Sequence, residues 1–289
     1  MNAAPTTPKL LVLGGPDSGK STYRVQVYQR FEHRPGVLKL LKSVGDFTEI
    51  VGDVDRVNQG LQPMHTSSNK YVSTDFALVD SAGRQYDLKF ADYDGEQLRR
   101  MSNSNLLSAP WVERTIQAES WLLFLRIDNI RAVKSFMTNP VASGPRVEAK
   151  ADAKPEPLPA GAVTESHAIE MLQRLLFVRS ASLRHQVDTP RLAVLLSCWD
   201  ELAASERAVA PDVLLASRAP LLSRFLMANW QPNSLRVWGL SSTERPLPAE
   251  KPDSEFARKG AENFGYIVVG ADQEDRDLTI PINWLLQPR

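Results

Sequence analysis

Apolar and polar residues follow one another along the chain in patterns that predict strands. Two apolar runs are continuous, Trp121–Ile127 and Leu192–Ser197, which is typical of buried parallel strands. Apolar and polar residues alternate in Gln85–Asp92, a pattern typical of a strand. This segment and Ser73–Asp80 flank a turn-rich tetrapeptide, so the two are predicted to form a hairpin. Further strands are predicted at Lys9–Leu13, Leu235–Leu240 and Tyr266–Val269.

Helices are predicted between these strands. In Ser166–Leu183, the apolar residues recur near helical spacing. Pro220 can open a helix but cannot continue one, so Pro211–Met227 predicts two helical pieces. The other helices are predicted at Thr22–Phe31, Glu96–Met101 and Trp111–Glu119. Strands that alternate with helices indicate an α/β fold, with a mostly parallel sheet that contains one antiparallel hairpin strand.

Two segments fall outside this alternation. Pro140–Glu165 is rich in Pro, Ala, Lys and Glu and nearly free of bulky apolar residues, so it is predicted to be a disordered loop. The elements on either side of it are of the same kind, which favours a single domain over residues 1–289 with the loop as an insertion. Leu38–Gly60 is long and is predicted to be partly helical.

A glycine-rich loop follows the first predicted strand and leads into the first predicted helix. Its sequence, Gly14-Gly15-Pro16-Asp17-Ser18-Gly19-Lys20-Ser21, has the G-x-x-x-x-G-K-S spacing of a phosphate-binding P-loop. Glycines let the backbone turn its N–H groups toward a polyphosphate, and the helix N-terminus adds its positive dipole end. Lys20 is predicted to reach the β- and γ-phosphates, and the Ser21 hydroxyl to bind Mg²⁺. The loop and Thr22 therefore predict binding of a nucleoside triphosphate.

Amino-acid composition bears on which partners the protein binds and on where in the cell it is found. Of the 289 residues, 43% are hydrophobic and 24% are charged, as in an ordinary soluble protein. Lys+Arg and Asp+Glu both number 34, so the net charge gives no case for a nucleic-acid or membrane partner. The single cysteine, Cys198, suits a reducing compartment, and residues 1–8 lack the apolar region of a signal peptide. We therefore expect a cytoplasmic location.

Two D-x-x-G sequences compete to provide a carboxylate for Mg²⁺. The first, Asp80-Ser81-Ala82-Gly83, is followed by alternating strand residues and not by a helix, so we interpret it as the hairpin turn. The second, Asp92-Tyr93-Asp94-Gly95, ends a strand and leads into a predicted helix. We assign Asp92 to Mg²⁺ through a water molecule and the Gly95 N–H to the γ-phosphate. Asp94 and Glu96 have a simpler interpretation as a solvated turn and a carboxylate in the first turn of a helix.

Ser197-Cys198-Trp199-Asp200 ends the strongest buried strand. Guanine-binding proteins commonly carry N/T-K-x-D there, and the aspartate accepts hydrogen bonds from guanine N1–H and N2–H. Asp200 fits this pattern, and Ser197 can still form a hydrogen bond to the loop. Cys198, however, cannot lay a long aliphatic stem over the base as a lysine does. The alternative for Asp200 is an N-cap of a following helix.

Taken together, these motifs and their order resemble those of the translation-factor-related class of P-loop GTPases. Within that class, the chain resembles the bacterial double-GTPase family found with GTPase-associated proteins in predicted conflict systems. The resemblance rests on the P-loop with Thr22, on Asp92-Tyr93-Asp94-Gly95-Glu96 and on Ser197-Cys198-Trp199-Asp200-Glu201-Leu202. The C-terminal Pro281-Ile282-Asn283-Trp284-Leu285-Leu286 is also similar to that family's ending. The resemblance as a whole implies a three-layer P-loop NTPase fold that binds GTP or GDP with Mg²⁺.

The resemblance implies roles for further residues. Two switch segments would reorder around the γ-phosphate, the first within an extended region at about 38–73. Its Mg²⁺-binding hydroxyl is expected at Thr66, with Ser67 and Ser68 as rivals. Glu96 takes the place of a glutamine that orients the attacking water; its carboxylate can act as a base or repel the γ-phosphate. Ser241 lies where GTPases place a serine-containing loop against the base.

Asp17 is a candidate for binding a monovalent cation. In a G-x-P-N/D-x-G-K-S loop, the polar residue at this place can coordinate K⁺ beside the phosphates. The alternative is a turn-favouring aspartate with no bound ion.

Three functions are compatible with these residues. The first is a GTP-dependent switch with slow or partner-assisted hydrolysis, the partner being a regulator, an effector or a second GTPase. The second is a nucleotide-binding scaffold without turnover, which Cys198 and Glu96 favour. The third is an ATPase or a kinase-like P-loop enzyme; against it, the antiparallel hairpin that leads into Asp92 suits the GTPase class better.

Overall fold

The computed structural model describes residues 9–42, 48, 50–64, 71–93, 107–131, 163–180 and 185–288. At residues 9, 71–73, 91–93, 131 and 163 it describes the backbone alone. The predicted helix at Glu96–Met101 therefore lies outside the described residues.

A nine-stranded sheet forms the centre of the described structure, in the order β11-β10-β9-β8-β5-β1-β4-β3-β2. Strands β4, β1, β5, β8 and β9 are parallel to one another. Strands β3 and β10 run antiparallel to the neighbours on both sides. The strands span β1 Lys9–Gly14, β2 Leu38–Leu40, β3 Tyr71–Asp80, β4 Gln85–Tyr93, β5 Ser120–Arg126, β8 Arg191–Ser197, β9 Leu235–Ser241, β10 Tyr266–Gly270 and β11 Gln273–Asp275.

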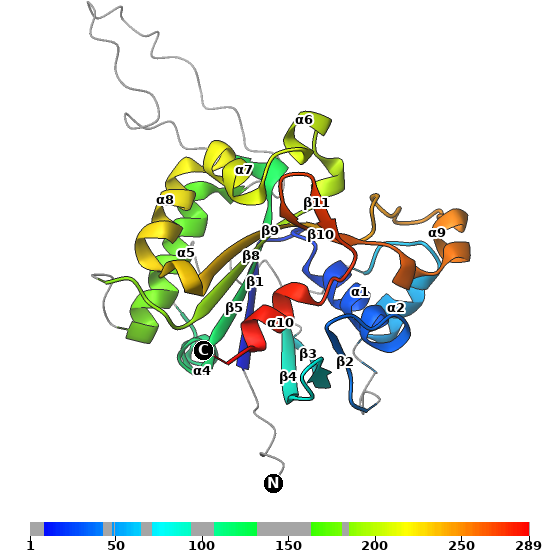
Figure 1. The fold of residues 1–289 in the computed structure, drawn as a ribbon, viewed down its shortest axis with the longest axis horizontal. Coiled ribbons are helices and arrows are strands. Elements are labelled where there is room, and N and C mark those ends of the chain that lie inside the picture. The colour runs from blue at the N-terminus through cyan, green and yellow to red at the C-terminus, as the bar shows by residue number, and fades with distance from the viewer. Residues whose placement is uncertain are drawn as a thin grey trace, which may run out of the picture.

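Helices cover both faces of this sheet, which gives three layers (Figure 1). The first face carries α1 Lys20–His33, α2 Val51–Asn58, α9 Ser254–Lys259 and α10 Ile280–Leu286. The second carries α4 Ala109–Gln117, α5 Glu165–Ser180, α7 Pro211–Arg218 and α8 Pro220–Asn229. The short helix α6 (Ala204–Arg207) follows β8, and a small parallel pair joins β6 (Ile130–Arg131) to β7 (Val163–Thr164).

The alternating directions of strand side chains explain the two layers. Along β5, Leu122 and Phe124 lie in the core on the α1 side, whereas Trp121 and Leu123 lie in the core on the α5 side. A strand buried on both faces needs apolar residues at every position, which is the continuous pattern of its sequence. In the β3–β4 hairpin, Leu88 is buried in the α1-side core and its neighbour Asp87 is exposed.

The structure confirms the α/β fold, the antiparallel hairpin and the division of Pro211–Met227 at Pro220. Several features were not predicted, among them helices α9 and α10, strand β11 and the β6–β7 pair. Leu38–Leu40 adds β2 beyond the hairpin, and β10 provides a second strand of reversed direction at the other side of the sheet. The predicted loop Pro140–Glu165 lies mostly outside the described residues, but its end belongs to β7 and α5.

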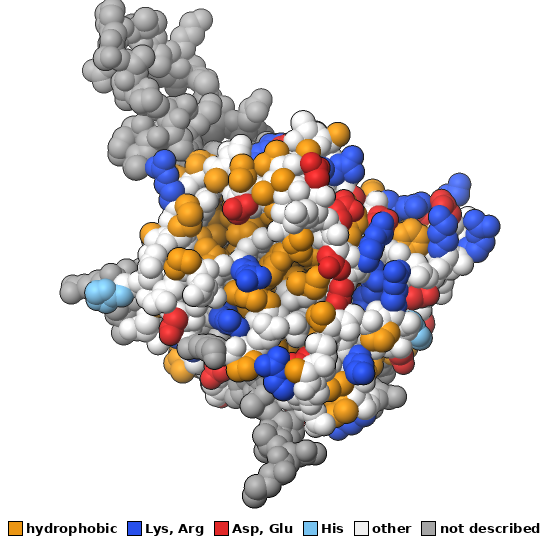
Figure 2. All heavy atoms as spheres, in the orientation of Figure 1, with side chains coloured by type: hydrophobic (Ala, Val, Ile, Leu, Met, Phe, Trp, Pro, Cys, Tyr) orange, Lys and Arg blue, Asp and Glu red, His pale blue; other side chains and the backbone are white. Residues whose placement is uncertain are grey.

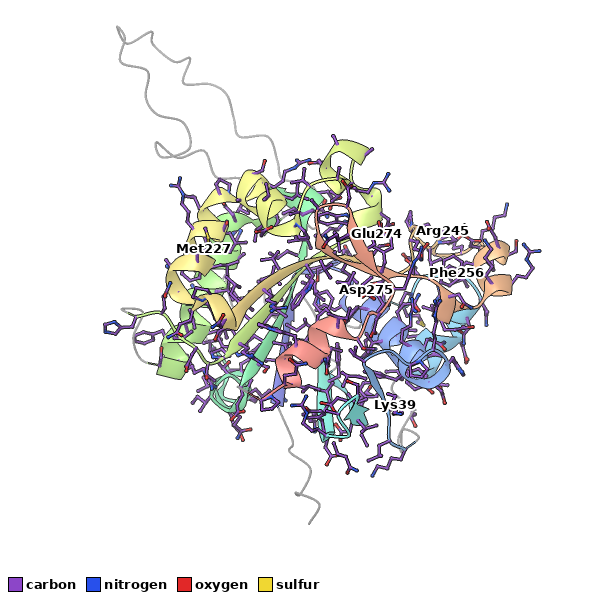
Figure 3. All side chains as sticks on the ribbon, viewed as in Figure 1. Lys39, Met227, Arg245, Phe256, Glu274 and Asp275 are labelled. Atoms are coloured by element: carbon purple, nitrogen blue, oxygen red, sulfur yellow. The ribbon has the colours of Figure 1, made fainter. Side chains whose placement is uncertain are left out.

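The last helix, α10, packs on the α1 side of the sheet and is joined to β8 by Arg191. Arg191 donates hydrogen bonds from Nη1 to the carbonyls of Trp284 (2.8 Å) and Gln287 (2.9 Å), and its guanidinium lies 4.9 Å from the Trp284 ring centroid. A cation at the C-terminal end of a helix satisfies carbonyls that lack partners within the helix. The side chains labelled in Figure 3 mark the extent of the sheet and its layers, with Lys39 on β2, Glu274 on β11 and Met227 on α8.

Charge is mixed on the molecular surface. On the face shown in Figure 2, Lys and Arg side chains stand among Asp and Glu side chains. Within the described residues, we find no helix with the length and apolar character that crossing a bilayer requires.

A substitution at Gly239 tests how tightly the core is packed below the end of β8. A Cβ atom at this position would lie 2.6 Å from the Trp199 indole and 2.9 Å from Val268 Cβ. We expect Gly239→Ala to lower the free energy of unfolding by about 1–3 kcal/mol, because overpacking forces its neighbours to shift. Denaturant unfolding measures this loss.

Gly52→Ala is the matched control, because a Cβ atom added to Gly52 in α2 would meet nothing within 4 Å. Alanine favours a helix, so this variant should be as stable as the parent or up to about 1 kcal/mol more stable. Equal stability of Gly239→Ala and the parent would contradict the packing described here.

Candidate nucleotide-binding site

The loop between β1 and α1 turns through backbone conformations that favour glycine. Gly14 has φ 154° and Gly19 has φ 81°. A Cβ atom on Gly14 would lie 2.7 Å from Ser18 Oγ and 3.0 Å from Phe124 Cβ, so space as well as backbone angle requires glycine there. Gly19 in turn places the loop directly before the first turn of α1, where Ser21 and Thr22 are half-buried.

Lys20 lies inside this loop. Its side chain is buried, and Nζ donates hydrogen bonds to the carbonyls of Gly14 (3.0 Å) and Gly15 (2.7 Å). Ser18 Oγ donates to the same Gly15 carbonyl at 2.8 Å. The ammonium group is therefore held at the centre of the loop, the position from which a lysine can reach the phosphates of a bound nucleotide.

Asp17 is exposed at the tip of the loop, with φ 54°. Aspartate tolerates this left-handed conformation better than most residues do. Its conformation thus agrees with the simpler interpretation of a turn residue, and binding of K⁺ by Asp17 stays a prediction.

Strand directions separate the two D-x-x-G sequences. β4 runs parallel to β1, with Leu11 opposite Ala91, so Asp92 and the glycine-rich loop come at the same edge of the sheet. Asp80 lies at the opposite end of β4, in the hairpin turn. The interpretation of Asp80 as a turn residue is confirmed. The backbone of Asp92 is at the required edge, while its side chain is outside the described part.

The hairpin turn occupies the Asp80 carboxylate fully. It accepts hydrogen bonds from the N–H groups of Ala82 and Arg84 (both 2.9 Å), from Arg84 Nε (2.7 Å) and from the Tyr86 hydroxyl (3.1 Å). Burial by itself raises the pKa of Asp80, but the hydrogen bonds from Arg84, Tyr86 and Ala82 lower it overall.

The end of β8 brings Asp200 to the adjacent strand β9. Cys198 adopts a left-handed conformation (φ 58°), and Trp199 then packs into the core over Gly239. Asp200 Oδ1 accepts a hydrogen bond from Ser241 Oγ at 2.5 Å, and Ser241 Oγ accepts one from the Glu244 N–H at 2.9 Å. Two residues singled out from separate motifs, Asp200 and Ser241, are thus in direct contact.

One sequence interpretation at this strand end, the N-cap alternative for Asp200, is wrong. Asp200 lies inside a 3₁₀ turn, Trp199–Glu201, and caps no helix there, because Ala203 precedes α6. The hydrogen bond that Ser197 can form to the loop is absent from the described structure, where Ser197 Oγ is buried and has no partner. Instead, a Cβ atom added to Gly19 would lie 3.6 Å from Ser197 Cβ, so the loop and β8 are in contact.

The sequence pattern did not predict a charged cluster that lies beside Cys198. Arg126 ends β5, and its Nη2 donates to Glu201 Oε2 at 2.6 Å, while Nε donates to Asp128 Oδ1 at 3.2 Å. Burial raises the pKa of Cys198 to about 12; the Arg126 charge opposes this shift, and Glu201 and Asp200 add to it. The thiol is therefore protonated at neutral pH. A basic residue at the end of the apolar β5 run was the one available signal.

Several predicted site residues lie outside the described ranges. They are Thr66 with its rivals Ser67 and Ser68, and Asp94, Gly95 and Glu96. Their roles stay predictions. In the parts of the chain that the structure does describe, no three His, Cys, Asp or Glu side chains come together as a metal site.

A family model matches nearly the whole chain. The sequence model of the Double-GTPase 1 family matches residues 11–285. Among solved structures, the chain is similar to sup35 complexed with GDP at 11% sequence identity and a TM-score of 0.33. That similarity covers 81% of this chain and 36% of the sup35 chain, so this chain spans about a third of that structure. No curated protein matches the sequence.

Asp80 gives a test that depends on pH. Its native pKa is below the value of about 3.9 for an unfolded aspartate, so its charge stabilises the fold above that pH. The contribution is lost as the pH falls through the native pKa. We expect Asp80→Asn to lower the free energy of unfolding by about 1–3 kcal/mol at pH 7, and by less in acid.

Urea unfolding at pH 7 and below pH 4 measures both values. Asp87→Asn is the control, because Asp87 is exposed on the same hairpin, and its effect should stay within about 0.5 kcal/mol. An Asp80→Asn effect equally small at pH 7 would contradict the role of the turn.

Proposed function

The chain belongs to the Double-GTPase 1 family of GTP-binding proteins, and on that premise we propose that it is a Mg²⁺-dependent, nucleotide-controlled switch. In this proposal, the P-loop holds the phosphates, Asp200 reads guanine, and hydrolysis is slow or assisted by a partner. The carrying observation is the Asp200–Ser241 pair at the carboxyl ends of β8 and β9. These strands are parallel to β1, so the pair lies at the same sheet edge as Lys20.

The base contact follows from the chemistry of this pair. A carboxylate can accept from both N1–H and N2–H of guanine, whereas adenine offers an acceptor at N1. Ser241 Oγ donates to one oxygen of Asp200 and thereby orients the carboxylate. Asp200 and Ser241 then favour guanine over adenine, which argues against the ATP-using alternative.

The residues present fit a magnesium ion. Ser21 is the second residue of α1, and β4 brings the backbone of Asp92 to the same sheet edge. A hydroxyl and a carboxylate are hard oxygen ligands of the kind that Mg²⁺ prefers. In the proposal, Ser21 binds the ion directly, Asp92 through water, and Thr66 joins in the triphosphate state. The ion supplies charge neutralisation at the β- and γ-phosphates.

Hydrolysis is the last step of the proposal. Lys20 stabilises negative charge that develops on the phosphates, and Gly95 contacts the γ-phosphate through its N–H. Glu96 takes the place of a water-orienting glutamine, so we propose low intrinsic GTPase activity that a protein partner raises. The partner is a regulator, an effector or a second GTPase. The cytoplasmic location and a role in bacterial conflict systems also belong to this proposal.

A scaffold without turnover is the second candidate. The observation that favours it is the conformation of Cys198, which places a short, protonated thiol where a lysine is common. This candidate predicts nucleotide bound to the purified protein, and no phosphate release even with partners present.

Asp200→Asn tests the base assignment. An amide donates where the carboxylate accepted, so the variant should prefer the carbonyl of xanthine. We expect the Kd for GDP to rise by about a hundredfold, since two hydrogen bonds to a charged group are lost, and the Kd for xanthosine diphosphate to fall. Fluorescence titration with both nucleotides measures the change.

Asp212→Asn, in the first turn of α7, is the matched control and should leave both affinities unchanged. If Asp200→Asn keeps the parent's preference for GDP, the assignment of Asp200 to guanine is wrong.

A further inference from the structure

The strand end that carries Asp200 leaves one face of the proposed base site to other residues. Cys198 has too short a side chain to cover a purine ring. In the turn after Cys198, Asp200 and Glu201 contact the two strands on either side of β8. Asp200 accepts a hydrogen bond from Ser241 on β9, and Glu201 accepts one from Arg126 on β5. Cys198 therefore lies between a carboxylate that can read the base edge and a guanidinium on the adjacent strand.

Arg126 is fixed in place by its partners. Arg126 lies opposite Ser197 in the β5–β8 ladder, and Ser197 directly precedes Cys198. The Glu201 carboxylate accepts from Nη2 at 2.6 Å, and Asp128 accepts from Nε at 3.2 Å. Two carboxylates on separate segments orient the guanidinium plane, while the side chain stays 27% exposed. Its charge also lowers the pKa of the Cys198 thiol against the effect of burial, in agreement with this proximity.

We propose that Arg126 covers the purine face in the place of the missing lysine. The proposal rests on the guanine-nucleotide site described above and adds a residue to it. A guanidinium is planar and weakly hydrated, and it stacks on aromatic faces. Stacking does not distinguish the substituents at the edge of the ring, since every purine has the same kind of face. Arg126 thus sets the affinity for purine nucleotides in general, and Asp200 sets the choice of guanine.

Equilibrium titrations of Arg126→Ala with GDP, IDP and ADP test this division of roles. Loss of one stacking contact is expected to raise the Kd of GDP by about tenfold. The Kd values of IDP and ADP should rise by the same factor, so the ratios between nucleotides stay those of the parent. Arg174→Ala is the control, because Arg174 is also paired with a glutamate, is 23% exposed and lies on α5. It should change each Kd by less than twofold.

A second variant separates stacking from a structural role. Cys198→Lys, introduced into Arg126→Ala, returns a long stem to the strand end and should restore most of the GDP affinity. Thermal unfolding establishes that each variant is folded. The proposal is overturned if Arg126→Ala binds GDP like the parent, or if a folded double variant binds GDP no better than Arg126→Ala.

The Kd changes of Arg126→Ala for the three nucleotides can contradict the proposal in a further way. A larger loss for GDP than for IDP, which lacks the exocyclic amine, would mean that Arg126 acts by positioning Asp200. A parent protein that binds none of the three nucleotides would instead contradict the proposed function itself.

Discussion

Burial of the central parallel strands on both faces is the constraint on which the rest of the structure depends. β1, β5 and β8 place apolar side chains in the cores on the α1 side and on the α5 side. Burial of apolar surface contributes about 25 cal/mol per Å², so these strands are strongly held in register. Because they are parallel, their carboxyl ends form one edge. The P-loop follows β1, Arg126 ends β5 and Asp200 follows β8, so the packing of these strands alone brings the three together.

Hydrogen bonds connect the last turn of α1 to the Asp200–Ser241 pair. Arg30, on the P-loop helix α1, donates from Nη2 to the carbonyls of Phe264 (2.7 Å) and Gly265 (3.0 Å). The Gly265 N–H donates to Glu244, whose own N–H donates to Ser241, the partner of Asp200. Burial and the charges of Arg34 and Arg276 lower the pKa of Arg30 to about 10, against the opposing effect of Asp277 and Glu244, so it remains charged at neutral pH. Helix α1, which begins at Lys20, and the Asp200–Ser241 pair are thereby joined by one hydrogen-bonded network.

The sequence predicted what depends on local patterns. Continuous apolar runs marked β5 and β8, and the turn at Ser81-Ala82-Gly83-Arg84 marked the hairpin. The glycine spacing correctly located the loop that encloses Lys20. Features that depend on distant partners were missed: β2 has only three residues, and it pairs with β3 from beyond the intervening helix α2. Arg126 meets Glu201 only because β5 and β8 are neighbours in the sheet.

The N-cap alternative for Asp200 failed for a related reason, since the left-handed turn at Cys198 redirects the side chain to β9. A sequence pattern does not reveal such a turn at a cysteine, which rarely adopts it.

In the proposed function, this edge binds a nucleotide through both its phosphates and a guanine base. The most direct measurement compares the Kd of GDP with that of ADP by calorimetry, using the parent protein in Mg²⁺. Both nucleotides offer the same phosphates to Lys20, so any difference reports the base. We expect GDP to bind at least about a hundredfold more tightly than ADP, because guanine can form two hydrogen bonds to the Asp200 carboxylate. Equal affinities for GDP and ADP would contradict it.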